Sequence, residues 1–240
     1  MYMERRRQNR VPAAHVEHGT VTPFGRYRGV LFFRPIPVLM STTASFSMRA
    51  EEARKALHLL ALSIPLGMDG LGMPVAGWIV TSGALLGILG DVLRVRWAPF
   101  RAFITRWFGP LMRPSEWPPL GGSVVLNGAT SVLIACAGAA WLFPLDVAVP
   151  VLCAALVADA AAALVGRRVG RHAWGAHGRT VEGSLAFVVV AVAVFGVFGL
   201  PWMALLIAAG AGAVLEALPL PVNDNIVVPL GMALVLVVMV

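Results

Sequence analysis

The sequence predicts an all-α protein, a polytopic transmembrane helix bundle of about seven spans with a cytoplasmic N-terminus. Three observations support this prediction: long uncharged apolar runs, a mean hydropathy of +0.80, and arginines confined to alternate connections between the runs. Of the 240 residues, 58% are hydrophobic and only 13% are charged. A soluble domain of this size cannot hide such runs from water, so lipid is their expected solvent.

The apolar runs define the expected membrane spans. A helix needs about 20 predominantly apolar residues to cross the hydrocarbon core, and the runs approach or reach that length. The expected spans are 53–68, 73–93, 122–143, 147–166, 184–200, 201–217 and 226–240. The first and the last are short, so the count of seven is approximate.

Lysines and arginines between the runs predict the orientation, because these residues are retained on the cytoplasmic side during insertion. They precede the first span and follow the second and the fourth, whereas segments 67–73 and 143–146 contain none. This alternation places the N-terminus inside and Val240 outside. We therefore expect a multi-pass integral membrane protein with its polar groups, and any active site, on the cytoplasmic face.

Two segments differ from the spans. Residues 1–48 are rich in Arg, Pro, Ser and Thr, and predict a basic, disordered tail before a transmembrane domain of 49–240; alternatively, translation begins at Met48. Segment 97–113 repeats aromatics and arginines at helical spacing. It is expected to form a helix in the cytoplasmic interface; the other interpretation is a loop that only follows the positive-inside rule.

The charge balance does not indicate a nucleic-acid partner. The net charge is +7 and the pI is about 10.9, but the arginines are scattered between apolar runs, where a positive-inside bias places them. Cys136 and Cys153 lie inside apolar runs, and no Cys/His cluster has zinc spacing. We therefore predict neither nucleic-acid binding nor a zinc site.

Asp159 is the most informative polar residue. It lies seven residues before Gly166, about 10 Å inside the expected span at about 1.5 Å per residue. A carboxylate at that depth requires a cation, a metal or a proton, which makes it a functional candidate. The alternative is a structural ion pair with an arginine of a neighbouring helix.

A loop rich in glycine and arginine follows Asp159. Glycines allow close backbone approach and arginines offer charge-assisted, often bidentate hydrogen bonds, so the loop suits a polyphosphate. The predicted phosphate-binding residues are Gly166, Arg167, Arg168, Gly170, Arg171, Arg179 and Gly183. The loop is not a Walker A motif, since Ala173 stands where its first glycine is required. The positive-inside rule alone is the other explanation for these arginines.

Further polar groups fall on the same predicted face. Arg54, Lys55 and His58 share a helix face at the entry to the first span, although a solvated helix start explains them equally. Asp91 and Arg94 close the second span and can simply pair with each other.

The C-terminal polar group consists of Glu216 and the triplet Asn223, Asp224 and Asn225 around a Pro-rich turn. Carboxylate and amide oxygens are the hard ligands that Mg²⁺ and its bound phosphates prefer. A turn that uses Asn and Asp for backbone reasons is the alternative. Together, a cationic loop and several carboxylates on one face predict phosphoryl transfer on a metal-bound polyphosphate.

These motifs, in their order and spacing, resemble the CTP-dependent lipid kinases, the family of dolichol kinase, phytol kinase and the yeast-type diacylglycerol kinase. The resemblance runs from about Glu51 to the C-terminus. Its segments are RKALH (54–58), GDVLR (90–94), RPSE (113–116), LNGAT (126–130), DAAAALVGRRVGR (159–171), RTVEGS (179–184) and EALPLPVNDNIVVPL (216–230). These segments add Glu116 and Asn127 to the polar candidates.

The resemblance implies transfer of the terminal phosphate of a nucleoside triphosphate, usually CTP, to a membrane lipid alcohol with Mg²⁺ or Mn²⁺. It implies catalytic roles for Asp159, Glu182 and Asp224, and adds Thr180 and Ser184 to the nucleotide site. The metal site it implies consists of Asp159, Glu216, Asp224 and Asn225. The family commonly has Lys where this chain has Arg179, a change that keeps charge but alters geometry.

Two other functions fit the sequence less well. Phosphatidate cytidylyltransferases resemble the same central loop, but their C-terminal signature is absent and PVNDN stands instead, at 221–225. A small transporter predicts polar residues at mid-membrane and on both sides, whereas nearly all charges after residue 50 are on the predicted cytoplasmic side. Residue types alone admit a polyprenol, a phytol-like prenol or a diacylglycerol as acceptor, and they indicate neither the choice among triphosphates nor an oligomeric state.

Overall fold

The computed structural model describes residues 48–175 and 178–240, with residues 48–52 described by their backbone alone. They belong to one compact unit, residues 45–240. Its helices are α1 (Met48–Leu60), α2 (Ser63–Leu71), α3 (Val75–Arg96), α4 (Ala98–Phe108), α5 (Gly128–Leu142), α6 (Leu145–Val169), α7 (Val181–Val197), α8 (Trp202–Ala217) and α9 (Asp224–Met239), with 3-10 turns η1 (Gly109–Leu111) and η2 (Pro114–Glu116). The predicted basic tail lies outside the described residues, except for Met48.

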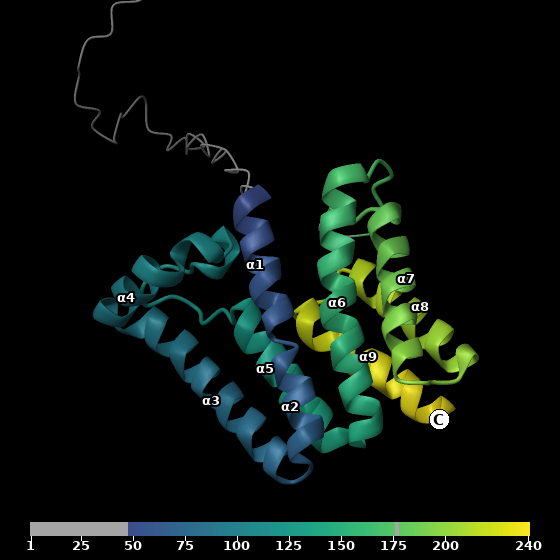
Figure 1. The fold of residues 1–240 in the computed structure, drawn as a ribbon. Coiled ribbons are helices and arrows are strands. Elements are labelled where there is room, and N and C mark those ends of the chain that lie inside the picture. The colour runs from purple at the N-terminus through teal and green to yellow at the C-terminus, as the bar shows by residue number, and fades with distance from the viewer. Residues whose placement is uncertain (1–47, 176–177) are drawn as a thin grey trace, which may run out of the picture. The chain divides into compact units, whose positions relative to one another are not determined.

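The predicted all-α class is confirmed in the described part of the chain, which contains helices and no strand. Its one β-type contact is an isolated bridge between Ala173 and Thr180, in the loop from α6 to α7. Figure 1 shows α6 in the middle of the arrangement, with α1 and α2 beside it and α7, α8 and α9 beyond it. The all-helical architecture thus gathers around one helix.

The expected first span, 53–68, is divided between two helices. α1 ends at Leu60 and α2 begins at Ser63, and the Ile64 amide donates to the Ala61 carbonyl over one short turn. Pro65 explains the break, because its missing N–H and its ring remove the helical bond to the carbonyl four residues earlier. The other expected spans each correspond to one helix, with ends shifted by several residues.

Two helices are long and apolar enough to cross a membrane by length and composition: α3 with 22 residues and α6 with 25. α5, α7, α8 and α9 are apolar but have 15 to 17 residues, fewer than the roughly 20 that a perpendicular span requires. The count of seven spans and the cytoplasmic N-terminus therefore stay predictions.

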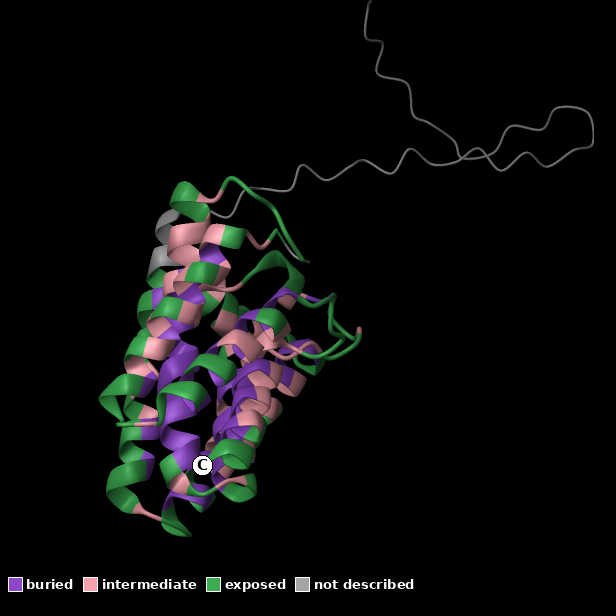
Figure 2. Cartoon of the chain, turned by 90° about the vertical axis from the view of Figure 1, so that its right-hand side faces the viewer, coloured by how far each residue is buried: buried purple, intermediate pink, exposed green. Residues whose placement is uncertain are grey.

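α6 forms the core of the unit. In its most apolar window 72% of the residues are buried, against 28% in that of α3. One side of α6 packs with α7, α8 and α9, where Val151 and Ala158 join Phe187 and Met232. Its other side packs with α2 and α5, where Leu152 joins a second cluster that also includes residues of α3. Buried residues accordingly concentrate inside the bundle, as Figure 2 shows.

Small residues allow the helices to approach closely, a mode of packing that is common in the helix bundles of membrane proteins. Gly212 of α8 is the clearest case, because an added Cβ would lie 2.6 Å from the Met232 sulfur and 2.8 Å from the Phe187 ring. Only glycine fits there without displacing the Met232 or Phe187 side chain. The contact packs α8 closely against α9 and α7.

Side-chain caps begin three of the helices that carry polar residues. Asn127, Thr180 and Asn223 accept hydrogen bonds from backbone amides in the first turns of α5, α7 and α9, at 3.0 to 3.1 Å. The start of α5 lies against that of α9, since a Cβ on Gly128 would be 3.6 Å from the Asn225 amide nitrogen. The capped ends thus bring polar residues from distant parts of the chain together.

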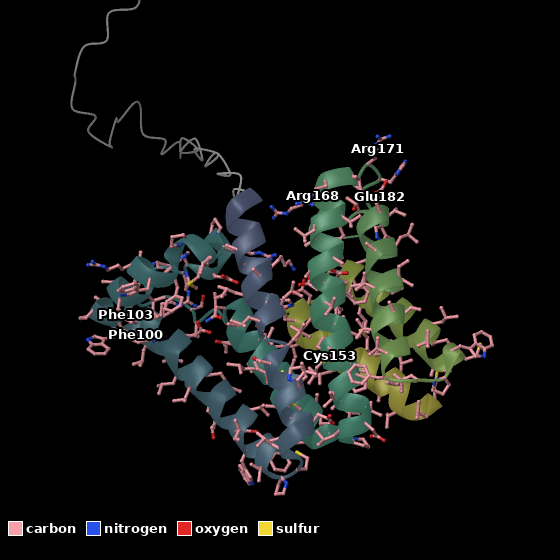
Figure 3. All side chains as sticks on the ribbon, viewed as in Figure 1. Phe100, Phe103, Cys153, Arg168, Arg171 and Glu182 are labelled. Atoms are coloured by element: carbon pink, nitrogen blue, oxygen red, sulfur yellow. The ribbon has the colours of Figure 1, made fainter. Side chains whose placement is uncertain are left out.

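Segment 97–113 is helical over α4 and ends in η1, as the sequence predicts. No residue of α4 is buried, and Phe103 and Trp107 are more than half exposed. Phe100 and Phe103 extend from the outer side of α4 in Figure 3. The interfacial position of this helix stays a prediction.

Candidate active site

Asp159 lies in a group of charged side chains that come from distant segments. Its Oδ2 forms an ion pair with Lys55 Nζ, and His58 Nε2 lies 3.3 Å from the same oxygen. Lys55 is only 3% exposed. Because Lys55 and His58 are on α1, these contacts fix α1 against the middle of α6.

Arg179 joins three carboxylates from three helices. Its Nη1 forms an ion pair with Glu216 Oε1 and lies 3.9 Å from Asp159 Oδ1, while Nη2 lies 2.5 Å from Asp224 Oδ2. Glu216 is buried. Among the described residues its Oε1 accepts no hydrogen bond, and its polar contact is the ion pair with Arg179 Nη1. The group defined here as the Asp159 cluster comprises Lys55, His58, Asp159, Arg179, Glu216 and Asp224.

The Asp159 cluster contains three carboxylates, Asp159, Glu216 and Asp224, and three basic groups, Lys55, His58 and Arg179. Buried charges are stable only with close partners. Because Arg179 is shared by all three carboxylates, the interpretation of Asp159 as a purely structural ion pair accounts for only part of the cluster.

A large cleft of about 790 Å³ opens beside the Asp159 cluster. Binding sites for ligands of drug or cofactor size commonly have volumes of about 300 to 1,000 Å³, so a nucleoside triphosphate fits. Its wall includes eight residues that the sequence predicts for the site: Gly166, Arg167, Arg179, Thr180, Gly183, Ser184, Glu216 and Asp224. The structure thus brings most of the predicted nucleotide-binding set to one cavity.

The predicted glycines serve helix packing. A Cβ on Gly166 would lie 3.0 Å from Thr180 Oγ1, and one on Gly170 would lie 2.8 Å from the same atom. A Cβ on Gly183 would lie 3.0 Å from the Ala162 carbonyl oxygen. These glycines allow the end of α6 to contact the start of α7, which positions Arg167 and Thr180 at the cleft.

A smaller, mostly apolar pocket lies among α5, α6, α7 and α9. We call it the apolar pocket. Its polar wall residues are His58, Asp159, Glu216, Asp224 and Asn225. Among the described residues, Glu216 and Asp224 are the two that line both the apolar pocket and the large cleft. The charged cluster therefore lies between a polar cavity and an apolar one.

Arg168, Arg171 and Glu182, all predicted for the site, lie outside both the Asp159 cluster and the two cavities. Arg168 and Arg171 are exposed. Figure 3 places Arg171 and Glu182 at the loop end of α6 and α7. Glu182 precedes the expected span 184–200, and its Oε1 lies 2.7 Å from His172 Nδ1, a hydrogen bond that lowers the pKa of Glu182 to about 2. These positions suit a loop-fixing role.

Four further predicted residues form a second group, defined here as the Asp91 group: Asp91 and Arg94, which are buried, and Glu116 and Asn127, which are half-buried. Arg54 is half-buried on α1 and belongs to neither group. Arg94 Nη2 lies 2.7 Å from Asp91 Oδ1, which confirms the simple pairing considered for these two residues. Asp91 also accepts hydrogen bonds from the Asn127 backbone and side-chain amides, at 3.0 and 2.9 Å. Asp91 therefore anchors the start of α5 to the end of α3.

The rest of the Asp91 group binds backbone atoms. Arg94 donates to the carbonyl oxygens of Glu116 and, at 2.9 Å, Val125, and its guanidinium lies 5.4 Å from the centre of the Trp117 ring. The Glu116 carboxylate accepts from the amides of Arg113 and Gly128. None of the four group members lines either cavity. Their role is to hold segment 113–127 in place.

The oxygen donors for a predicted metal are gathered, with a guanidinium among them. Asp159, Glu216 and Asp224 all contact Arg179, and Asn225 lines the same pocket as these carboxylates. In the described part of the chain, no group of three or more His, Cys, Asp and Glu side chains is arranged as a metal site. The donor chemistry nevertheless fits a hard divalent cation, which prefers carboxylate and amide oxygens.

Sequence reasoning did not identify two features of the site. Lys55 and His58 were candidates, but nothing in the sequence predicts that they contact Asp159, 104 and 101 positions away. The apolar pocket was also missed. The one signal in the sequence that could have pointed to it is Pro229, a proline inside the apolar helix α9, because such prolines in membrane helices often mark functional backbone.

Comparison with known proteins places the chain in a family. No family model matches it, and no solved structure matches significantly. It is 30% identical over 216 residues to CTP-dependent diacylglycerol kinase 1 of Schizosaccharomyces pombe, an alignment that covers 81% of this chain and 96% of the relative. It is also 27% identical over 195 residues to an uncharacterised protein of Rickettsia prowazekii, with 77% and 92% covered. The chain therefore belongs to the family of CTP-dependent lipid kinases.

Proposed function

We propose that this protein is a membrane lipid kinase that transfers the γ-phosphate of CTP to a lipid alcohol on the cytoplasmic face. One observation carries the proposal: Glu216 and Asp224, both paired with Arg179, lie in the wall shared by the large cleft and the apolar pocket. A polar nucleotide and an apolar acceptor can meet there. Family membership and the charge of the cluster support the same reaction.

Arginines of the large cleft supply the charge that a triphosphate requires. Arg113, Arg167 and Arg179 line it, and guanidinium groups form charge-assisted, often bidentate hydrogen bonds with phosphate oxygens. Charge on the transferring phosphoryl group is spread over its oxygens, so a fixed cation beside it lowers the barrier. Arg179 is best placed for the γ-phosphate because it also contacts the carboxylates of the apolar pocket.

Asp159 is the group proposed to receive the acceptor hydroxyl. It lines the apolar pocket, and Lys55 and His58 hold its carboxylate. The hydroxyl oxygen attacks the γ-phosphorus, and the new O–P bond forms while the bond to the β–γ bridging oxygen breaks. CDP leaves with that electron pair, and the hydroxyl proton passes to Asp159.

Mg²⁺ or Mn²⁺ is proposed to bind to side-chain oxygens of Asp159, Glu216, Asp224 and Asn225. The metal would neutralise charge on the phosphate oxygens. Arg179 must then exchange carboxylate partners for phosphate oxygens when the nucleotide is bound, since both cations draw on the same carboxylates. Removing divalent ions with a chelator is expected to abolish transfer, and adding Mg²⁺ back is expected to restore it.

The test is label transfer by the purified full chain in detergent with Mg²⁺. CTP labelled at the γ-phosphate is offered with diacylglycerol, a polyprenol and phytol, and lipid products are extracted into organic solvent. Diacylglycerol is offered first because the S. pombe relative is named for it. We expect γ-label in the extract with at least one alcohol and none with the Asp159→Asn protein. Incorporation of α-label with phosphatidate, and of no γ-label with any alcohol, would instead establish a cytidylyltransferase.

A further inference from the structure

The connection between α6 and α7 carries Arg179 on two short stretches of paired backbone. These stretches, 172–175 and 178–181, are the described part of the connection that is defined here as the Arg179 hairpin. They run antiparallel, and the Trp174 amide donates to the Arg179 carbonyl at 3.0 Å, with a second backbone bond of 2.9 Å between the same stretches. The main chain of Arg179 is therefore held by a hydrogen bond of its own.

Two side chains fix the Arg179 hairpin to α6 and α7. Thr180 Oγ1 accepts from the Gly183 amide at 3.1 Å, and a Cβ on Gly166 would lie 3.0 Å from the same oxygen, so Thr180 lies between the two helix ends. Trp174 Nε1 donates to Ser184 Oγ at 2.8 Å, which adds a second tie to α7. The hairpin is thus attached to the helices that it connects.

Gly175 places the hairpin against a third helix, α8. A Cβ on Gly175 would lie 2.6 Å from the Ala217 carbonyl oxygen and 2.8 Å from the Ala217 Cβ, and the φ of Gly175 is +68°. Only glycine combines this conformation with such a close approach. Ala217 ends α8 and directly follows Glu216, a carboxylate that Arg179 contacts. The hairpin therefore contacts α8 beside one partner of its own arginine.

These contacts leave Arg179 between attachments to α6 and α7 and an attachment to α8. From there its guanidinium reaches carboxylates on α6, α8 and α9. An unrestrained arginine loses much rotamer freedom when it is fixed, and a misplacement of about 1 Å in a reacting geometry can cost about 100-fold in rate. A backbone that is already in place reduces this cost.

We propose that the Arg179 hairpin positions the Arg179 guanidinium for phosphoryl transfer, and that Gly175, through its contact with Ala217, is a positioning residue of the reaction. The inference rests on the proposed lipid kinase function and adds to it a residue that touches no substrate. Gly175 lines neither the large cleft nor the apolar pocket. Its effect on the reaction must therefore pass through Arg179.

The first experiment compares Gly175→Ala with Gly199→Ala. Gly199, in the connection from α7 to α8, has a φ of +71°, but a Cβ there would meet nothing within 4 Å. Both variants strain the backbone in the same way, and only Gly175→Ala collides with a neighbouring helix. With the purified full chain and the accepted lipid alcohol, we expect Gly175→Ala to lower kcat about tenfold, with KM for CTP and the melting temperature close to those of Gly199→Ala. Equal kcat values for the two variants would overturn the inference.

A double variant tests whether the effect passes through Arg179. Where one residue acts only through another, its substitution has no further effect once the second residue is gone. We expect Gly175→Ala to change the kcat of the Arg179→Gln protein by no more than about twofold. A further loss of about tenfold would show that Gly175 acts independently of Arg179, which would overturn the inference and leave the lipid kinase function in place.

A third variant approaches the same contact from α8 and leaves the backbone of the hairpin unstrained. Ala217 is 5% exposed, and its Cβ faces Gly175, so Ala217→Val presses on the hairpin from the other side. We expect kcat to fall about fivefold, again with KM for CTP close to wild type and with no further loss in the Arg179→Gln protein. A wild-type kcat in Ala217→Val would contradict the positioning role of the contact.

The last experiment is independent of phosphate transfer. Hydrogen–deuterium exchange is measured by mass spectrometry in peptides that cover the Arg179 hairpin. Because the contact with α8 supports the paired backbone, we expect the amides of Trp174 and Val181 to exchange about fivefold faster in Gly175→Ala than in Gly199→Ala. Unchanged exchange would overturn the inference whatever the reaction is. Faster exchange in a protein whose wild type phosphorylates no alcohol would support the contact and contradict the proposed function.

Discussion

The Asp159 cluster and the Asp91 group contain the same residue types and serve different purposes. Each has an Asp paired with a cation and an Arg, but the Asp91 group directs its hydrogen bonds mainly to backbone amides and carbonyls of segment 113–128. In the Asp159 cluster, the ionised groups contact mainly one another and line two cavities. Backbone partners indicate a structural role, while ion pairs between side chains beside a cavity indicate a site for a charged ligand.

The two groups differ in how their charges are paired. Asp91 and Arg94 compensate each other's charge, and Asn127 and the main chain form their other hydrogen bonds, although Arg94 Nε has no partner among the described residues. In the Asp159 cluster, one guanidinium contacts three carboxylates beside the large cleft. Charged side chains that share one partner next to a cleft are available to a charged ligand. Substitutions in the two groups should therefore affect different measurable properties.

The largest expected effect is on catalysis, in Asp159→Asn. The variant removes the charge that pairs with Lys55 and Arg179 and the proposed proton acceptor. We expect the rate of phosphate transfer to fall by about 10³-fold, with membrane insertion and yield retained. Asp146→Asn, at the exposed opposite end of α6, is the matched control and should transfer phosphate at the wild-type rate. Loss of protein from the membrane, rather than of activity, would make Asp159 structural, like Asp91.

The second largest effect on catalysis is expected for Arg179, because its guanidinium contacts three carboxylates. We expect Arg179→Gln to lower kcat about 100-fold, as for the loss of a group that stabilises transition-state charge. Arg179→Lys keeps the charge but not the fork-shaped geometry, so about a tenth of the activity should remain. The measurement is initial rate against CTP concentration. Equal rates for the Gln and Lys variants would show that the charge of Arg179 is not what matters.

Arg94→Ala sharpens the comparison from the structural side. Removing one partner leaves Asp91 buried and uncompensated, a change that destabilises folded proteins by roughly 3 to 5 kcal/mol. We expect a markedly lower melting temperature in detergent, with kcat per folded molecule within about twofold of wild type, since Arg94 lines neither cavity. Arg96→Ala, exposed on the same helix, is the control and should melt like wild type. Loss of kcat without loss of stability in Arg94→Ala would give the Asp91 group a catalytic role.

The smallest effect is expected for Glu182→Gln, which changes a loop contact outside both regions. We expect a rate about threefold lower, because the His172 contact is exposed and such contacts contribute little.

The same contact predicts a pH dependence. The His172 hydrogen bond is the main cause that lowers the pKa of Glu182 to about 2 from its usual 4.5, so the contribution of this carboxylate to stability is complete above pH 4.5 and is lost as the pH falls through 2. Activity measured between pH 5 and pH 9 should show no transition from this carboxylate. A rate loss as large as that of Asp159→Asn would return Glu182 to the catalytic group.

Much of the site was predictable because its chemistry is uncommon in an apolar chain. Asp159, Arg179, Glu216 and Asp224 were all candidates from the sequence, since a charged residue within an apolar run requires a partner or a ligand. The partner could not be predicted. Lys55 contacts Asp159 across 104 positions, and only the packing of α1 on α6 brings the two side chains together.

Some features could not be predicted because residue type does not fix a local environment. Gly166 and Gly183 line the large cleft, so their phosphate-binding role stays a prediction, but their missing side chains also make room for each other's helices. The expected first span is interrupted because Pro65 lacks the N–H that would continue the helix. In each case the competing demand was packing or backbone hydrogen bonding, which a pattern of residue types does not record.

The sequence by itself determined the helical class, the apolar runs and the set of charged residues within and between them, because hydropathy and charge are properties of residues taken singly. Tertiary structure decided which of these charges form the Asp159 cluster and which form the Asp91 group. It also created the large cleft and the apolar pocket between helices that are far apart in the chain. Cavities and ion pairs depend on distances between segments, and those distances exist only once the helices have packed.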